Sequence, residues 1–298
     1  MPARLLAAAA VEVGGAIYIG GGPGEDSSPF QVYKLLLDTL QWLTLPLPQH
    51  RVMFFTLAGC SGSVHMLGGL YSPLTKPQGA KHESGSVLTF DEHAACPWVE
   101  RLPSLSTPRH SANAVSIGSY IVIAGGELGD KRLSSVEVID TSVEQPSWYN
   151  VGALPEPMYR PRMVVWQDKL VVGLGIVFKF FVRRMYTIPL SKLLKKDLPI
   201  TESVWNKLPE APLKRSALAV LCGQLVTIGG SDSEKTPQAN CAVFDPRKKC
   251  WNEISKLAVQ RALPAAVSTD QGIFVIGGVF GVGHCLTKTT EIGVLQNS

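Results

Sequence analysis

Arginine is the residue type whose placement in this chain could do chemistry at several points at once. An arginine repeatedly opens a short run of small apolar residues along the 298 residues: Arg4, Arg51, Arg109, Arg160, Arg215 and Arg261. A guanidinium group is planar, carries five N–H donors and pairs with carboxylates through two parallel hydrogen bonds. It also bonds to backbone carbonyls. If these runs meet in space, the arginines form either a cationic binding surface or a set of internal braces, and both interpretations stay open.

The sequence lacks the short motifs that mark common catalytic sites. It contains no Walker loop, GxSxG, HExxH or paired-cysteine motif. The run Gly20-Gly21-Gly22-Pro23-Gly24 is followed by neither a Lys-Ser/Thr pair nor a helical pattern, so it predicts a turn. We therefore expect no catalytic residue, no metal site and no cofactor.

The cysteines and histidines are scattered. The six cysteines are Cys60, Cys96, Cys222, Cys241, Cys250 and Cys285, without CxxC spacing. This pattern favours reduced thiols and a cytoplasmic location. The six histidines are His50, His65, His82, His93, His110 and His284. His65 falls in an apolar run, which predicts a core histidine with a hydrogen-bond partner.

Composition excludes several classes of protein. Hydrophobic residues make up 45% of the chain and charged residues 17%, which excludes a disordered chain. The net charge of +4 is spread out instead of forming a basic stripe, so we expect no nucleic-acid partner. The apolar stretches at residues 5–11 and 170–178 are far shorter than the ~20 residues of a membrane-spanning helix, so we expect no membrane partner.

An internal repeat organises the whole chain. Apolar runs ending in a glycine pair recur about every 50 residues. The pairs are Gly20-Gly21, Gly68-Gly69, Gly125-Gly126, Gly229-Gly230 and Gly277-Gly278, with a degenerate copy at Leu174-Gly175. An aromatic or aliphatic residue, often with Asp, follows each run, then a tryptophan (Trp42, Trp98, Trp148, Trp205, Trp251) and usually a Leu-Pro element.

This order of Arg, Gly-Gly, Tyr/Phe-Asp, Trp and Pro closely resembles the kelch-repeat family, and it covers nearly all of the chain. The resemblance implies an all-β, six-bladed β-propeller with four antiparallel strands per blade. We label these strands a to d and expect a single domain over 1–298. The predicted blades cover 4–50, 51–108, 109–159, 160–214, 215–260 and 261–298.

The last blade is expected to be incomplete, because the chain ends before a tryptophan-bearing strand d follows residues 289–295. That would leave an unpaired strand edge and uncovered apolar surface between blades six and one. We therefore expect a monomer unless this blade self-associates. In the other blades the tryptophans named above should be buried between neighbouring sheets.

The resemblance also implies where a ligand would bind. In kelch proteins the loops before strand a and after strand b gather at one end of the propeller and hold the ligand contacts. The residues at those positions are Arg51, Arg109, His110, Arg160, Arg162, Arg215, Arg261, Tyr71, Glu127, Asp232 and Phe280. So many guanidinium groups favour an acidic or carboxylate-ended peptide.

The expected function is protein recognition without enzymatic activity. Many kelch proteins carry a BTB or F-box module that couples the propeller to a ubiquitin ligase, so a substrate-recognition part of such a ligase is one form of this function. The alternative is a sugar-processing propeller enzyme, similar to a sialic acid mutarotase, because the fold by itself does not decide function.

Overall fold

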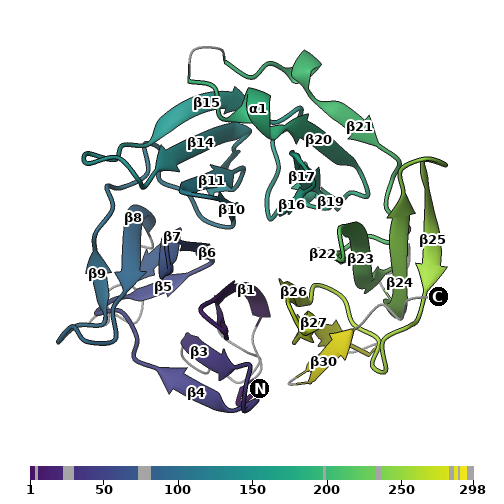
Figure 1. Ribbon diagram of the computed structural model, residues 1–298, viewed down its shortest axis with the longest axis horizontal. Helices are drawn as coiled ribbons and strands as arrows, with labels where there is room; N and C mark the ends of the chain where they lie inside the picture. Colours follow the sequence, from purple (N-terminus) through teal and green to yellow (C-terminus); the bar gives the residue numbers. More distant parts are fainter. Residues whose placement is uncertain are drawn as a thin grey trace.

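The computed structural model describes residues 1–3, 6–22, 30–72, 82–196, 199–232, 236–281, 285–287 and 289–293. These residues form six antiparallel sheets placed side by side around a central axis (Figure 1). Helix is confined, in the described residues, to α1 (Leu190–Leu193) and a 3-10 turn at Glu202–Val204. The protein is therefore an all-β, six-bladed propeller, as the repeat predicts.

Each blade runs from an inner strand a to an outer strand d. Blade one contains β1 (Leu6–Val13), β2 (Ala16–Gly22), β3 (Gln31–Leu36) and β4 (Trp42–Leu45). Blade two contains β6 (Thr56–Cys60), β7 (Ser63–Ser72), β8 (His82–Phe90) and β9 (Trp98–Glu100), and β5 (Arg51–Met53) also pairs with β7. Blade three contains β10 (Asn113–Ile117), β11 (Tyr120–Ala124), β14 (Ser135–Asp140) and β15 (Tyr149–Ala153).

The second half follows the same plan. Blade four contains β16 (Arg162–Trp166), β17 (Lys169–Gly173), β20 (Met185–Pro189) and β21 (Asn206–Leu208). Blade five contains β22 (Ala217–Leu221), β23 (Gln224–Ser231), β24 (Pro237–Asp245) and β25 (Cys250–Ile254). Blade six contains β26 (Ala265–Thr269), β27 (Gly272–Ile276) and β30 (Thr290–Gly293).

Small two-stranded ribbons extend from three blades, between strands b and c. They are β12 (Glu127–Leu128) with β13 (Lys131–Arg132), β18 (Ile176–Val177) with β19 (Phe180–Phe181), and β28 (Val279–Phe280) with β29 (Cys285–Leu286).

The glycine pair is required because the chain bends there against neighbouring backbone. In blade three, Gly125 and Gly126 have φ values of +66° and +94°. A Cβ atom on Gly125 would lie 2.4 Å from the Met158 carbonyl oxygen, and one on Gly126 would lie 2.6 Å from that of His110. Glycine accepts this backbone conformation and leaves room for the close approach. The pair thus fixes the end of strand b against the loop of its own blade and that of the next.

The tryptophans tie neighbouring blades together. The indole N–H groups of Trp98, Trp148 and Trp205 donate to the carbonyls of Pro46, Pro103 and Ala153, each at 2.9 Å, in the blade before. Trp251 donates to the Pro209 carbonyl in the same way, at 3.3 Å. Trp98, Trp148 and Trp205 are buried, but Trp42 and Trp251 are only half-buried. The expected burial therefore holds for three of the five tryptophans.

Blade six has three strands in the described residues, as expected. No strand in this part of the chain pairs with the outer edge of β30, where Ile292 is 45% exposed. Its junction with blade one is nevertheless packed: Phe274 and Ile276 lie in one apolar cluster with Ile17 and Ile19, all fully buried. The expectation of uncovered apolar surface at this junction is therefore wrong for its inner half, because β26 and β27 pack directly against blade one.

Candidate ligand-binding face

The loops before strand a and after strand b meet at one end of the propeller, here called the loop face. In four blades a residue before strand a forms a backbone bridge with a residue just after the glycine pair. In blade four, Leu174-Gly175 takes the place of that pair. The bridged pairs are His110–Glu127, Tyr159–Ile176, Lys214–Ser231 and Ala262–Val279. Each bridge holds the two loop sets together, so residues far apart in sequence share one surface.

Five equivalent residues in blades two to six surround the entrance to the central channel, two positions before the first paired residue of strand a. This mouth ring consists of Phe54, Ser111, Arg160, Arg215 and Leu263, whose φ values lie between +52° and +58°. The Ser111 N–H donates to the Phe54 carbonyl at 2.7 Å, and the Leu263 N–H donates to the Arg215 carbonyl at 2.8 Å. The ring is therefore held partly by backbone bonds between blades.

The arginines are not structurally equivalent, although the sequence places them in one series. Arg160 and Arg215 belong to the mouth ring, whereas Arg109 and Arg261 precede it by two residues. The side chain of Arg51, and all of Arg4, lie outside the described residues. The series therefore contains at least two kinds of arginine with different roles.

Arg109 and Arg261 are internal braces. The Arg109 guanidinium is completely buried, donates to the carbonyls of Gly125 and Ser135 at 3.0 and 3.2 Å, and pairs with the buried carboxylate of Glu137. Arg261 repeats the arrangement with the carbonyls of Gly277 and Thr289 and the carboxylate of Glu291. Their guanidinium groups are turned into their own blades and do not face a ligand.

Blades two, four and five replace this brace. The residues equivalent to Arg109 are Val52, Met158 and Leu213. In blade two, Leu88 stands where blade three has Glu137, so an apolar pair replaces the ionic one. In blade four, Glu156 instead binds Arg184 through two hydrogen bonds of 2.9 and 2.7 Å.

Arg160 and Arg215 present cations to the loop face, each against aromatic rings. The Arg160 guanidinium lies 5.1 Å from the ring centres of both Phe54 and Tyr159. The Arg215 guanidinium lies 4.4 Å from the ring centre of Phe181. These cation–π contacts hold the two side chains in place while leaving their N–H donors free of carboxylates within 4 Å in the described part of the chain.

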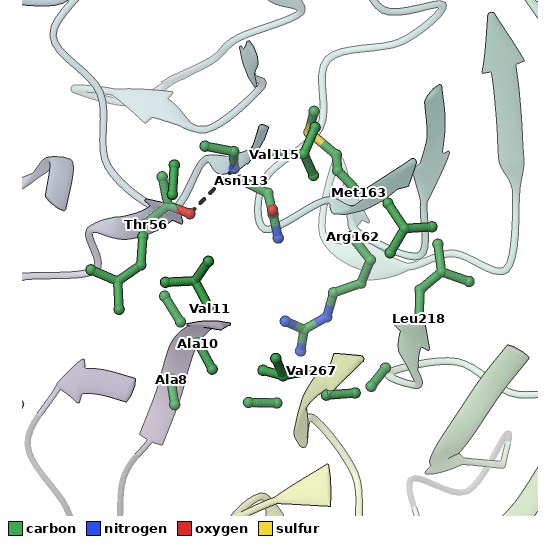
Figure 2. Close-up of a pocket in the computed structure, with 18 of the residues that line it drawn as sticks. Ala8, Ala10, Val11, Thr56, Asn113, Val115, Arg162, Met163, Leu218 and Val267 are labelled. Atoms are coloured by element: carbon green, nitrogen blue, oxygen red, sulfur yellow. Dashed lines mark hydrogen bonds between the residues drawn. The ribbon is translucent and has the colours of Figure 1, made fainter. Parts of the chain in front are cut away.

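Arg162 lies inside the channel. It is the first paired residue of β16, and its side chain extends toward the middle of a cavity of about 410 Å³ (Figure 2). Asn113, the equivalent residue of β10, also points into this cavity. Burial first, and the charge of Arg160 second, lower the pKa of Arg162 to about 10, which leaves the group charged at neutral pH.

The other expected site residues occupy varied positions. His110 is buried, with its Nε2 atom 3.8 Å from a Glu127 carboxylate oxygen, and burial lowers its pKa although Glu127 and Glu83 oppose that shift. Asp232 accepts hydrogen bonds from the Thr236 N–H and the Gln238 side chain, which orders its own loop. Phe280 is 36% exposed on the ribbon of blade six.

Tyr71 belongs to a different part of blade two. Its ring packs against His50 at a tilt of 40°, with centres 4.6 Å apart, and it lines a second cavity of about 430 Å³ with Met66 and Trp98. None of the mouth-ring residues lines that cavity.

Two exposed phenylalanines on the loop face were not expected from the sequence. Phe178 and Phe180, on the ribbon of blade four, are 83% and 73% exposed. Exposed large aromatic side chains are unusual on a monomeric surface and are common at protein interfaces. The sequence signal that could have found them is the position of Phe178 and Phe180 just after the degenerate Leu174-Gly175 motif. The apolar pattern of this segment instead assigns them to the interior.

The described residues contain no group of three or more His, Cys, Asp or Glu side chains placed to share a metal ion. In the same part of the chain, no helix has the length and apolar character needed to cross a membrane. Fold and surface together define a β-propeller whose loop face carries cations and exposed aromatics around a central channel.

Comparison with known proteins agrees with this class. A profile of the Kelch motif matches residues 108–155 and 212–258. Kelch-like protein 15 of Danio rerio is 23% identical over 256 residues, which cover 82% of this chain and 41% of the relative. The Kelch repeat and BTB domain-containing protein 1 of Cowpox virus (strain Brighton Red) is 24% identical over 270 residues, which cover 88% of this chain and 44% of the relative.

The solved structure of YjhT has a TM-score of 0.77 with this protein, covering 97% of this chain and 95% of that chain at 15% identity, which shows the shared fold. Two segments of this chain therefore match the Kelch motif, and the described residues have a β-propeller fold. The chain spans less than half the length of the two kelch relatives, 41% and 44%.

Proposed function

We propose that this propeller is a protein-interaction module whose loop face binds a protein or peptide partner through acidic groups and an apolar anchor. The observation that carries the proposal is the combination of Arg160 and Arg215 with the exposed Phe178 and Phe180 on one face. Arginine and aromatic residues dominate the binding energy of protein interfaces. The kelch relatives support an interaction role in general.

The acidic character of the partner is argued from the two mouth-ring arginines. Each is half-buried, and each is held by an aromatic ring and not by a carboxylate. A guanidinium fixed in this way has lost much of its side-chain freedom before a ligand arrives, which lowers the entropy that binding must overcome. Carboxylates are the protein groups that match its paired donors.

A role as the substrate-recognition part of a larger assembly extends this proposal. One relative is named for both kelch repeats and a BTB domain, and this chain matches 44% of its length. A propeller that recognises a partner while another segment or subunit carries the remaining activity fits that arrangement. A ubiquitin-ligase adaptor is the form that the family resemblance suggests.

The test is affinity purification with the folded chain, followed by binding measurements on each protein recovered. Two variants alter the loop face: Phe178→Asp with Phe180→Asp, and Arg160→Glu with Arg215→Glu. We expect both to lose the partner, and we expect wild-type binding to weaken as salt is raised.

The matched control changes exposed residues on the turns between strands c and d, at the opposite end of the propeller: Val143→Asp with Lys248→Glu. This variant should bind as the wild type does. Partners recovered equally by all four proteins would contradict the proposal.

A further inference from the structure

The inner end of the loop face has an asymmetric lining. The first paired residues of strand a in blades two, three and four are Thr56, Asn113 and Arg162. The equivalent residues of blades five, six and one are all alanine: Ala217, Ala265 and Ala10. The small side chains of one half leave the space into which Arg162 extends (Figure 2).

Arg162 crosses the channel. It belongs to blade four, yet its Nη2 atom donates to the Pro264 carbonyl of blade six at 3.4 Å, a long and weak hydrogen bond. The Asn113 side chain is fixed beside it, because its amide donates to the Pro161 carbonyl at 3.1 Å. The second N–H of that amide has no partner among the described residues. Donors from two blades therefore converge on one space.

This guanidinium also lacks a counter-ion. Three other arginines each have one: Arg109 has Glu137, Arg261 has Glu291 and Arg184 has Glu156. No carboxylate of the described residues lies within 4 Å of Arg162. Glu12 lines the same cavity, but it accepts a hydrogen bond from the Gly15 N–H in the turn at the far end of β1.

Arg162 is half-buried, and partial burial of a cation without a paired anion is unfavourable, so the site favours an anion that fits. The volume and lining of the cavity restrict the class of anion that it can bind. A volume of about 410 Å³ admits a small organic group, and Val115, Leu218 and Val267 provide apolar wall around the guanidinium. A planar carboxylate matches the fork of guanidinium donors and can take the amide N–H as well.

We propose that the channel binds one carboxylate, held by Arg162 and Asn113, with its short apolar substituent against Val115 and Val267. The carboxylate belongs either to a free small acid or to an acidic residue of the bound partner. The second source rests on the function proposed above, whereas the first does not.

The experiment measures thermal stability and calorimetric binding with butyrate, and with butyramide as the neutral isostere, at constant ionic strength in sodium chloride. We expect butyrate to raise the melting temperature and butyramide to leave it unchanged. The dissociation constant for butyrate should rise by roughly tenfold or more in Arg162→Gln, because a charge-assisted pair is lost. Asn113→Ala should raise it less.

Lys248→Gln is the control, since it removes an exposed cation at the opposite end of the propeller and should retain butyrate binding. Arg162→Lys keeps the charge but loses the fork, so it should bind with intermediate affinity, which tests the site even if Arg162→Gln folds poorly. Equal responses to butyrate and butyramide would overturn the proposal. So would a shift reproduced by chloride alone, or an unchanged response in Arg162→Gln.

The two sources are separated by a second pair of probes, N-acetylglutamate amide and N-acetylglutamine amide. Binding of the acidic probe only, lost in Arg162→Gln, supports an acidic residue as the occupant. Binding of butyrate with no difference between these two probes supports a free acid. Loss of the protein partner in Phe178→Asp with Phe180→Asp, with butyrate binding retained, would show that the channel and the outer face act separately.

Discussion

The backbone N–H of Arg160 donates to the Ser111 carbonyl at 2.8 Å. Arg160 is therefore the structural equivalent of Ser111 in its blade, and not of Arg109. Both residues lie two positions before the first paired residue of their inner strand, with φ values of +52°. Arg109 therefore has a different task from Arg160, and substitutions at the two arginines should have different effects.

Removing the Arg109 brace should destabilise the fold. Arg109→Val leaves the fully buried Glu137 without its cation, which typically costs about 3–5 kcal/mol. Combining it with Glu137→Leu recreates the Val52 and Leu88 pair of blade two and should recover most of the loss. The recovery is incomplete because Glu137 also accepts the N–H groups of Ser106 and Thr107. Urea unfolding of the single and double variants checks this, and a double variant less stable than Arg109→Val would contradict it.

The tryptophans should differ in their contribution to stability. Trp148→Ala removes an 8% exposed indole and its bond to the Pro103 carbonyl, so the free energy of unfolding should fall by about 3–5 kcal/mol. Trp251→Ala should cost clearly less, because that indole is half-buried and its hydrogen bond is longer. Equal losses in denaturant unfolding would show that exposure does not set the contribution.

The glycine pair should tolerate no side chain. Gly126→Ala combines a φ of +94° with a Cβ position 2.6 Å from the His110 carbonyl oxygen. Gly118→Ala is the control, since Gly118 also has a positive φ, +58°, but nothing lies within 4 Å of its Cβ position. The control should lose about 1–2 kcal/mol from backbone strain alone. We expect Gly126→Ala to lose considerably more, measured by thermal unfolding.

Acid should destabilise the protein partly through His65. This buried side chain is hydrogen-bonded to the Thr89 hydroxyl at 3.0 Å, and burial lowers its pKa, although a hydrogen bond with the Cys60 backbone opposes the shift. The unfolded chain, with a histidine pKa of about 6.5, then binds more protons than the folded one as the pH falls. Stability is therefore complete above that pH and decreases below it.

His65→Gln should reduce the difference in unfolding free energy between pH 8 and pH 5.5. His93→Gln, at a side chain that is 90% exposed, is the control and should leave the difference unchanged. An unaltered pH dependence in His65→Gln would contradict the assignment.

The fold was predictable because its determinants are local and repeated. Each Gly-Gly pair lies within or directly after strand b, and five of the six tryptophans lie in or just before the outer strand, so their spacing defines the blades. The face was less predictable. Arg109 and Arg160 both stand before an apolar run, and a two-residue difference in register cannot be detected when linker lengths vary. Positive φ at Ser111 and Arg160 has no sequence signal, because neither is glycine.

The exposure of Phe178 and Phe180 was also not predictable from the sequence. Phe178 and Phe180 follow an apolar strand and look like its continuation, but the ribbon carries them away from the sheet. Arg162 extends into a cavity that Ala10, Ala217 and Ala265 also line, and these alanines come from three other blades. Such a relationship exists only once the ring has closed.

In the mouth ring, the backbone holds the loops together, and the side chains determine what the loop face can bind. Its bonds between blades use only backbone N–H and carbonyl groups, and Phe54, Ser111, Arg160, Arg215 and Leu263 all adopt nearly the same φ. Substituting a side chain at one of these positions therefore leaves the backbone hydrogen bonds between blades in place. Substitutions at these positions can therefore change ligand specificity one blade at a time while the backbone of the ring is retained.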